Sequence, residues 1–252
     1  MAKLGRLVPR HFGFSMPATA PAVLAPPVYL RNMEVVIVSY HTEEEEALNL
    51  LPEGLELVEP ATATLIVANY HFTTWGPYNE AILGVSCKWQ GQPMAYLPYL
   101  MVTQEAPLIA GREVWGYGKK LAHVSVTHEH DQQIGIIERP TGNRIATAVM
   151  RPIANISAEG FGFPPVVGLK VIPSAEQAER PALAQLVSLE FRVTPMIGSD
   201  GLAELWSGPG SLVFNSPTTD DPWHRLAVRE VTSCVYGRCN GYVPFGKILK
   251  QY

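Results

Sequence analysis

The sequence is short of charge, of cysteine and of long apolar runs, and each shortage excludes a class of protein. Only 17% of the 252 residues are charged, the formal net charge is −4 and no basic cluster occurs, so we expect neither a nucleic-acid partner nor an anionic membrane partner. The three cysteines are odd in number and do not suggest a disulfide framework. No segment approaches the roughly 18–20 apolar residues of a membrane helix, and no signal peptide is recognisable. We therefore expect a soluble cytoplasmic protein.

The patterns that hold nucleotides and metal ions are missing as well. There is neither a regular alternation of strands and helices nor a glycine-rich phosphate loop. His128 and His130 alternate on an expected strand and could face one zinc ion, but no third ligand stands at a useful spacing, so a polar strand end is the simpler interpretation. Cys234 and Cys239 lack the CxxC spacing of a metal or redox site. We expect no metal and no cofactor.

Short β-branched and aromatic runs, divided by turn residues, fill most of the chain. Turns such as Thr141-Gly142-Asn143 separate these runs, which is typical of an antiparallel sheet or barrel. No repeat or linker splits the series, so we expect a single mainly β domain over residues 28–252 with a few peripheral helices. The expected strands cover residues 28–40, 62–72, 81–89, 95–102, 124–130, 134–139, 144–151, 168–172, 185–193, 211–214 and 228–236.

The two ends of the chain are expected to differ from this body. Residues 1–27 are rich in proline and alanine, and their prolines break any regular element. We expect an extended arm that either wraps over the body or joins a subunit contact. At the other end, residues 242–252 are expected to form a helix after Pro244, with its apolar side chains on one side.

One short acidic helix is expected between the first two strands. Thr42 and Glu45 fit a capping box, in which Thr42 is the N-cap and Glu45 reaches back to it. Pro52 would end the helix, and the four glutamates at 43–46 suit the positive end of the helix dipole. We interpret these glutamates as structural rather than catalytic.

The most informative stretch is residues 111–122, which read GREVWGYGKKLA. A lysine pair at a turn is usually a solvated surface feature. A lysine held in an apolar pocket can instead lose its proton, and the neutral amine attacks carbonyl groups to form a Schiff base. If the two lysines are extended, Lys119 and Lys120 point to opposite faces, so burial rather than mutual repulsion would favour a neutral Lys119.

This stretch resembles the active-site signature of the acetoacetate decarboxylase family, which is itself a standard example of an activated lysine. In that signature Gly-Arg-Glu precedes an aromatic-Pro-Lys-Lys-Leu run. Further landmarks stand in the family's order, so the resemblance covers nearly the whole chain from about residue 30. The resemblance implies one continuous, mostly antiparallel β fold of barrel or double-barrel form, in a homo-oligomer. The further landmarks are residues 50–53, 78–80, 168–173, 206–209, 212 and 226–231.

The resemblance also implies roles for single residues. Lys119 corresponds to the Schiff-base residue, and Lys120 to its companion in the catalytic motif. Glu80, in the run Pro-Tyr-Asn-Glu, corresponds to an acidic residue that positions substrate or shuttles protons beside the iminium. Tyr117 is an apolar neighbour of Lys119 in sequence and a candidate contact for the substrate.

Two positions depart from the family pattern in a way that bears on the substrate. The family's carboxylate-binding arginine aligns by spacing with Met33, and its second pocket glutamate aligns with Leu65. Strand alternation would place Arg31 on the same face as Met33, where it could supply the missing cation. Arg112 is the other candidate, unless it pairs with Glu113 or with a strand carboxylate as a structural tie.

These residues predict a cofactor-independent lyase that uses a Lys119 iminium as an electron sink and takes a small keto acid or other carbonyl compound as substrate. The leading reaction is decarboxylation of a β-keto acid. The first alternative is an aldolase or aldolase–dehydratase that joins a keto acid such as pyruvate to an aldehyde. The second is a non-catalytic protein that binds small carbonyl compounds, against which Lys119 and Glu80 argue. Because Met33 and Leu65 replace charged residues, we expect weak turnover of acetoacetate and a preference for larger, more apolar β-keto acids.

Overall fold

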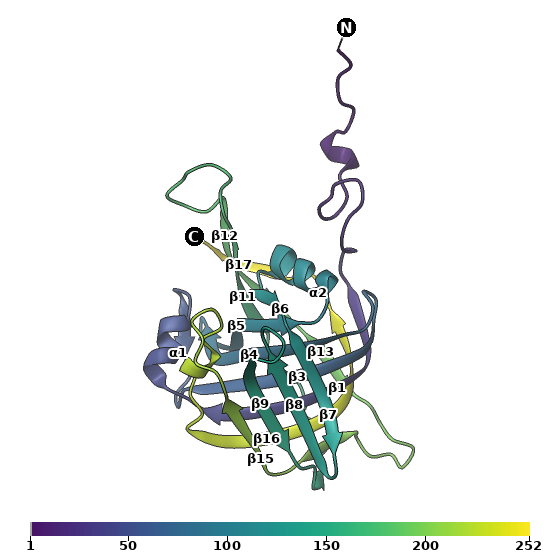
Figure 1. The fold of residues 1–252 in the computed structure, drawn as a ribbon, viewed down its shortest axis with the longest axis vertical. Helices are drawn as coiled ribbons and strands as arrows, with labels where there is room; N and C mark the ends of the chain where they lie inside the picture. Colours follow the sequence, from purple (N-terminus) through teal and green to yellow (C-terminus); the bar gives the residue numbers. More distant parts are fainter. Residues whose placement is uncertain (1) are drawn as a thin grey trace.

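The computed structural model describes residues 2–252, and most of its regular structure is β-strand (Figure 1). The expected strands form because their side chains alternate between two buried or half-buried faces. The strands are β1 (Val28–His41), β2 (Leu55–Leu57), β3 (Thr62–Thr73), β4 (Tyr78–Trp89), β5 (Gln92–Val102), β6 (Lys119–Leu121), β7 (His123–Glu129), β8 (Gln132–Glu138), β9 (Arg144–Met150), β10 (Ala154–Asn155), β11 (Val166–Ile172), β12 (Leu183–Leu189), β13 (Arg192–Pro195), β14 (Leu205–Ser207), β15 (Gly210–Phe214), β16 (Glu230–Val243) and β17 (Lys247–Gln251). The helical elements are α1 (Glu44–Leu50), α2 (Glu105–Ala110), a π-helical turn (Gly111–Trp115) and two 3-10 turns (Pro9–His11 and Trp223–Arg225).

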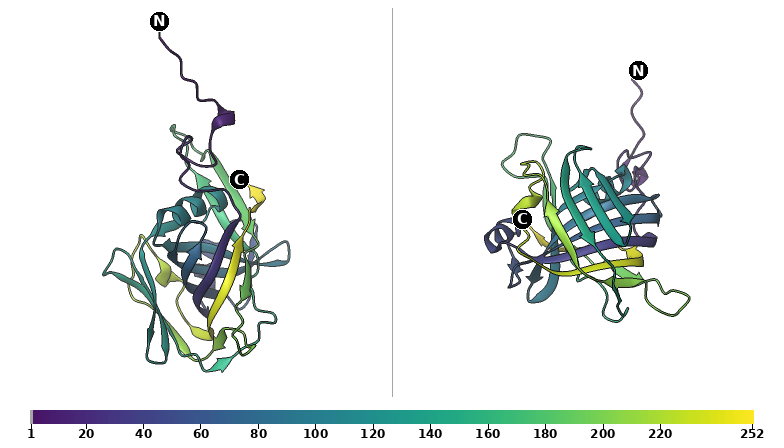
Figure 2. Two further views of the ribbon diagram at one scale, coloured as in Figure 1. Left: turned by 90° about the vertical axis from the view of Figure 1, so that its right-hand side faces the viewer. Right: turned by 60° about the horizontal axis from the view of Figure 1, so that its bottom comes forward.

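The strands assemble into one large sheet of thirteen strands and one small sheet of four. The large sheet runs in the order β10, β14, β16, β1, β3, β4, β5, β11, β12, β17, with β13, β2 and β6 paired to its sides. The small sheet, β15, β9, β8, β7, lies across the long strands of the large one (Figure 2). Pairing is antiparallel except between β5 and its parallel partners β11 and β6. The mainly β, antiparallel prediction is confirmed, whereas the strand order is an open path and does not close as a barrel would.

The large sheet buries side chains on both of its faces. One face packs against the small sheet, in a core that includes Leu65 and Leu83 of the large sheet and Ile137 of the small sheet, all fully buried. The other face holds a second apolar cluster that includes Met33 and Trp115. Because side chains alternate along each strand, neighbouring residues of β3 and β4 serve different cores. This division decides which residues can reach the functional site.

Residues 2–27 form no α-helix or strand and extend away from the body in Figure 1. The arm touches the body where the ring of Phe14 packs edge-on against Phe245, with centroids 6.1 Å apart. Ser15 accepts a hydrogen bond from the backbone N–H of Val23, a residue that is itself buried. Within residues 2–252, no helix is long and apolar enough to cross a membrane.

The acidic helix forms, but the predicted capping box is wrong. Helix α1 begins at Glu44 with Glu43 as its N-cap, and no side chain caps it. Thr42 is instead held by the sheet, because its backbone N–H donates to the carbonyl of Ala61 at 3.0 Å. Glu43 pairs with Arg229, which ties the helix to the C-terminal part of the chain and agrees with a structural role for the acidic run.

The predicted C-terminal helix is also wrong. After Pro244 the chain forms β17, which pairs antiparallel with β12. Without β17, β12 would expose a row of unpaired backbone groups at the edge of the sheet. The carbonyl of Pro244 accepts a hydrogen bond from Trp115 Nε1 at 3.2 Å, so the tail is anchored to the turn that precedes the lysines.

Candidate active site

Helix α2 and the π-helical turn that follows it set the position of the lysine pair. The turn ends at Gly116, whose φ of 78° lies in the left-handed region. A Cβ on Gly116 would lie 2.4 Å from the Cα of Lys170, so only glycine allows β11 to approach this closely. The chain then enters β6, which pairs parallel with β5 and places Lys119 opposite Leu100.

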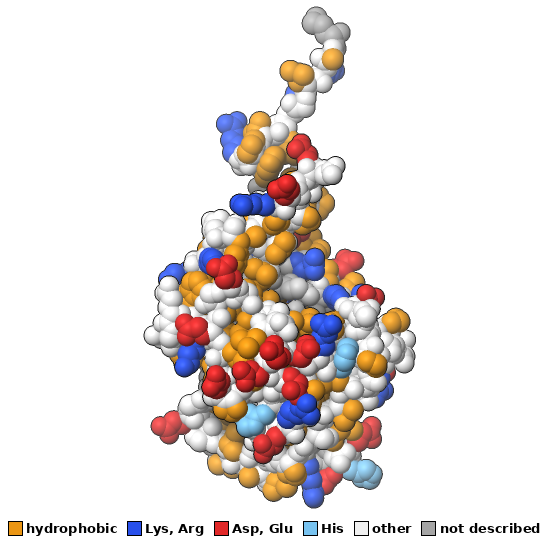
Figure 3. Space-filling view, turned by 90° about the vertical axis from the view of Figure 1, so that its left-hand side faces the viewer, with side chains coloured by type: hydrophobic (Ala, Val, Ile, Leu, Met, Phe, Trp, Pro, Cys, Tyr) orange, Lys and Arg blue, Asp and Glu red, His pale blue; other side chains and the backbone are white. Residues whose placement is uncertain are grey.

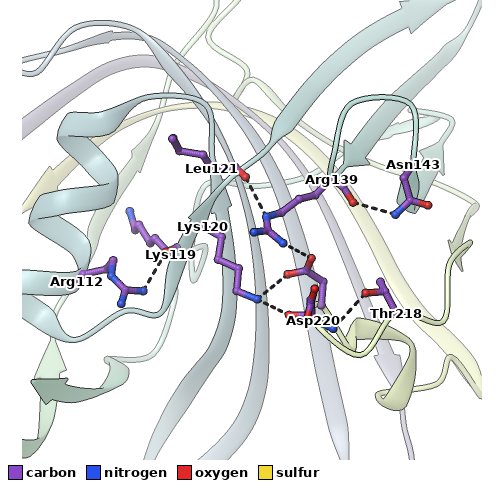
Figure 4. Close-up of polar contacts among 9 residues, drawn as sticks. Arg112, Lys119, Lys120, Leu121, Arg139, Asn143, Thr218 and Asp220 are labelled. Carbon is purple, nitrogen blue, oxygen red and sulfur yellow. Dashed lines mark hydrogen bonds and ion pairs between the residues drawn. The ribbon is translucent and has the colours of Figure 1, made fainter. Parts of the chain in front are cut away.

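The two lysines point to opposite sides of β6, as strand alternation predicts (Figure 4). The side chain of Lys119 is only 8% exposed, whereas that of Lys120 is 39% exposed. Lys120 Nζ lies 2.9 Å from Asp221 Oδ1 and also contacts the carbonyl of Asp220. Lys120 therefore does not share the cavity that holds Lys119.

Glu80 is the direct partner of Lys119. Its Oε1 lies 2.7 Å from Lys119 Nζ, and its side chain is 5% exposed. Glu80 comes from β4, next to Ala68 of β3, and so faces the core away from the small sheet. A Cβ on Gly111 would lie 2.5 Å from Lys119 Cδ, so the missing side chain leaves the space that the lysine stem occupies. Gly111, the first residue of the Gly-Arg-Glu run, thus has a packing function.

The pair lines a cavity of about 170 Å³. Its lining is mostly aliphatic and aromatic, and includes Met33, Trp115 and Tyr117. Phe161 and Phe163, from the loop between β10 and β11, close another side together with Phe191. Within residues 2–252, Lys119 is the only basic residue and Glu80 the only acidic residue that line the cavity.

Three tyrosines surround Glu80. Burial first, and the negative charge of Glu80 second, raise the pKa values of Tyr70, Tyr78 and Tyr117 well above the usual value. These hydroxyls are therefore protonated donors at neutral pH. The Tyr117 hydroxyl is buried and has no hydrogen-bond partner among residues 2–252, which leaves it free for a bound molecule. Sequence reasoning missed Tyr78, although strand alternation alone puts it on the face of Glu80.

Lys120 belongs to a separate ion-pair network. Asp221, which is 3% exposed, binds Lys120 through Oδ1 and Arg139 Nη1 through Oδ2, the latter at 2.6 Å. Arg139 also donates to the carbonyl of Leu121 at 3.2 Å (Figure 4). The network connects β6 to β8 and to the loop before β16. Nothing in the sequence links these three residues, which are far apart along the chain.

The predicted place of Arg31 is wrong. Asn32 has a φ of 52°, and the pairing of β1 with β16 shifts register between Leu30 and Met33. This bulge inserts an extra residue, so Leu30 and Met33 both face the cavity while Arg31 is exposed on the other side. Arg31 stacks over Tyr29, 5.4 Å from the ring centre, and donates to the carbonyl of Leu30.

Leu65 and Arg112 also lie outside the cavity. Leu65 is fully buried in the core between the two sheets, and its neighbours Thr64 and Ile66 line the cavity instead. Arg112 is exposed and donates from Nη1 to the carbonyl of Lys119 at 3.3 Å. It is thus a structural tie, though its acceptor is a backbone carbonyl and not the Glu113 or strand carboxylate that the sequence suggested.

His128 belongs to a polar cluster away from the cavity. Its Nε2 lies 2.8 Å from Glu34 Oε1, which also accepts a hydrogen bond from the Tyr236 hydroxyl at 2.7 Å. His130 lies beyond the end of β7 with a φ of 55°. Among residues 2–252 no group of three or more His, Cys, Asp and Glu side chains is arranged to hold a metal ion.

Comparisons with known proteins show which family and which solved structures the chain is similar to. A family model described as acetoacetate decarboxylase matches residues 15–252. The chain is 30% identical over 247 residues to acetoacetate decarboxylase 2 of Mesorhizobium japonicum. This match covers 96% of this chain and 91% of that protein. Acetoacetate decarboxylase from Legionella pneumophila has a similar structure, with a TM-score of 0.85, 27% identity and coverage of 100% and 99% of the two chains. The enduracididine biosynthesis enzyme MppR, complexed with the condensation product of pyruvate and imidazole 4-carboxaldehyde, shares the fold with a TM-score of 0.81, 22% identity and 99% coverage of both chains.

Proposed function

The chain belongs to the acetoacetate decarboxylase family, and from this premise we propose that it is a Schiff-base lyase that decarboxylates a β-keto acid through Lys119. One observation carries the proposal: a buried lysine whose Nζ lies 2.7 Å from a buried glutamate, with both side chains lining an apolar cavity. A surface lysine has no need of such a partner or of such surroundings. A lysine that must form an iminium needs both.

The proposed reaction uses Lys119 and Glu80 in turn. The neutral amine of Lys119 attacks the substrate carbonyl, and loss of water from the resulting carbinolamine leaves an iminium. The iminium accepts the electron pair of the breaking carbon–carbon bond, carbon dioxide leaves, and an enamine remains. Glu80 gives the proton that it took from Lys119 to the hydroxyl that leaves the carbinolamine as water, and after it takes a second proton from solvent it protonates the enamine carbon. Water then hydrolyses the new iminium, which releases the ketone and the free amine.

The charges of the cavity support a particular kind of substrate. Within residues 2–252 no second cation lines the cavity, so a substrate carboxylate enters without an ion partner. An unpaired carboxylate in apolar surroundings is costly, which weakens binding but favours its loss as neutral carbon dioxide. A small acid such as acetoacetate has little apolar surface to offset that cost. A larger apolar acid has more apolar surface, and its burial can offset more of that cost.

Aldol condensation is the second candidate, and the Tyr117 hydroxyl, which has no hydrogen-bond partner among residues 2–252, is the observation that favours it. The iminium and enamine of Lys119 also serve a reaction that joins a keto acid to an aldehyde and expels no carboxylate. The Tyr117 hydroxyl, free of protein partners, could donate to the oxygen of the incoming aldehyde. The shared fold with MppR supports the same architecture for either reaction.

One set of assays on a single preparation tests the proposal. Release of carbon dioxide is measured with a panel of β-keto acids, and absorbance of a conjugated product is measured with pyruvate plus an aromatic aldehyde. We expect carbon dioxide from the larger apolar acids, and none with the Lys119→Ala variant. Formation of the condensation product without release of carbon dioxide would show that the protein is an aldolase and not a decarboxylase. If neither product forms, the protein is a binding protein for carbonyl compounds and the proposal is wrong.

A further inference from the structure

The cavity continues well beyond the Lys119–Glu80 pair. Its lining residues on β4 are Tyr78, Glu80, Ile82, Gly84 and Ser86, which are every second residue of that strand. They therefore share one face of the sheet. Six residues of a strand at about 3.3 Å each separate Glu80 from Ser86 by roughly 20 Å. The cavity is thus long, and its apolar run from Ile82 to Ser86 lies on the side of the charged pair away from Tyr78.

The neighbouring strands continue this apolar floor. Thr64 of β3 lies opposite Gly84, and Ala95 of β5 lies opposite Ser86, and both line the cavity. Leu97 lines it beside Gly84. Beyond Ile82 every lining residue of these strands is small or apolar and none is charged. This part of the cavity offers a ligand burial but no ionic contact.

We propose that the substrate carries an extended apolar chain, which lies along β4 over Ile82 and Gly84 towards Ser86 while its carbonyl group reacts at Lys119. The reacting end of this assignment rests on the proposed function, whereas the binding of the chain does not. A four-carbon acid would leave the cavity beyond Ile82 unfilled. Straight-chain β-keto acids of medium length fit both the charged pair and the long apolar part.

Gly84 decides how far such a chain can reach. A Cβ at this position would lie 3.0 Å from Leu97 Cδ2 and 3.5 Å from the carbonyl oxygen of Tyr96. Because Leu97 Cδ2 is the flexible end of a side chain, Gly84→Ala requires only a small shift. Gly84→Val adds branched bulk in the middle of the apolar floor and should block the chain there.

Chain length gives a quantitative expectation. Each methylene group moved from water into an apolar site contributes a factor of about four in binding. For the wild-type protein, kcat/KM should therefore rise about fourfold per methylene through the series of straight-chain β-keto acids, until the tail passes Ser86. For Gly84→Val the rise in kcat/KM should stop at a shorter chain than for the wild type. Gly84→Ala should stop at a length between those of the wild type and Gly84→Val.

The experiment measures carbon dioxide release for β-keto acids of increasing length with the wild type, Gly84→Ala and Gly84→Val. Gly5→Val, in the arm where an added side chain meets nothing within 4 Å, is the matched control and should behave as wild type. In parallel, the Kd of methyl ketones of matching length is measured by calorimetry on Lys119→Met, which cannot form the Schiff base. The same dependence on chain length, shortened by Gly84→Val, is expected in both measurements.

The two measurements separate the two proposals. Carbon dioxide release that is equally efficient at all lengths would overturn the chain assignment and leave the lyase standing. Ketone binding that tightens with length, without carbon dioxide from any acid, would support the chain site and overturn the decarboxylase. A wild type without dependence on length in either measurement would overturn the chain assignment whatever the variants do.

Discussion

Lys119 and Lys120 are neighbours in the chain, yet their surroundings give them different roles. Lys119 is buried, faces the cavity and, among residues 2–252, forms an ion pair only with Glu80. Lys120 is partly exposed and pairs with Asp221, a buried carboxylate that also holds Arg139. A cation that already has an anionic partner on the far side of the strand exerts little repulsion on Lys119. Burial and Glu80, rather than Lys120, are therefore the main influences on the nucleophile.

The first prediction concerns Lys120→Met. We expect the pH midpoint of Schiff-base formation to move by less than about one unit, because Lys120 points away from the cavity. The free energy of unfolding should fall by about 1–2 kcal/mol, since Asp221 loses one of its two charged partners. Borohydride trapping at a series of pH values and chemical denaturation measure the two effects. An upward shift of more than one unit would show that repulsion from Lys120 does disfavour the ammonium form.

The second prediction concerns Arg31→Ala. The bulge at Asn32 turns Arg31 out of the cavity, so the variant should keep the wild-type KM within about twofold for any acid that is decarboxylated. Met33→Ala, which enlarges the cavity lining on the same strand, is the contrasting variant and should change KM. A tenfold rise in KM for Arg31→Ala, worth about 1.4 kcal/mol, would mean that Arg31 binds the substrate carboxylate after all.

At the scale of elements, the sequence predicted the regular strands well and the irregular backbone poorly. The β-branched and aromatic runs located β1, β3, β4 and β5, and these runs are nearly continuous because both faces of the strands are buried or half-buried. The bulge at Asn32 leaves no period-2 signal, and it puts Arg31 on the face opposite to Met33, although strand alternation predicted one shared face. The strand β17 has an ambiguous apolar pattern, and only its pairing with β12 decides its structure. The prediction that Leu65 stands in the substrate pocket is wrong for a related reason. The face on which Leu65 lies follows from the register of the sheet and not from its distance along the chain to the motif.

The candidate site was predictable to the extent that it lies in one motif. Lys119, Glu80 and Tyr117 were found because a motif and strand alternation mark them. Tyr70 and the Asp221 network come from distant segments that only the fold brings together. The π-helical turn Gly111–Trp115 was expected only as a turn, because no local pattern distinguishes an inserted residue in a helix.

The third prediction concerns this turn. Gly111→Ala should reduce the yield of the Lys119 adduct at least about tenfold, because the new Cβ would overlap Lys119 Cδ. Gly118→Ala, where the nearest atom to a new Cβ is the carbonyl oxygen of Pro98 at 3.6 Å, should retain most of the yield. Circular dichroism checks that both variants stay folded. Equal yields from the two variants would contradict the packing role of Gly111.

At the scale of the whole molecule, charge and apolar exposure are unevenly distributed. The arm carries Lys3, Arg6 and Arg10 but no acidic residue, and it exposes apolar side chains such as Leu4 and Met16. The body is acidic, and Figure 3 shows acidic side chains gathered on the side of the molecule where α1 lies. Exposed apolar side chains on an extended segment are typical of a region that packs against another chain.

The fourth prediction follows from the arm. We propose that the protein is a homo-oligomer in which the arm contacts a second copy, so deletion of residues 2–14 should give a smaller particle. Light scattering measures the mass, and high salt should have a similar but weaker effect on the full chain because it screens the basic residues. The body should stay folded, since the hydrogen bond between Ser15 and Val23 is retained. An unchanged mass would show that the arm is not part of a subunit contact.

The measurement that tests the central claim most directly is trapping of the Schiff base. The protein is incubated with a medium-chain β-keto acid and borohydride, digested, and analysed by mass spectrometry of its peptides. We predict one added mass, that of the reduced product ketone, on Lys119 and on no other residue, and no adduct on the Lys119→Ala protein. An adduct that forms equally well on Lys119→Ala would contradict the assignment of the nucleophile and the chemistry built on it.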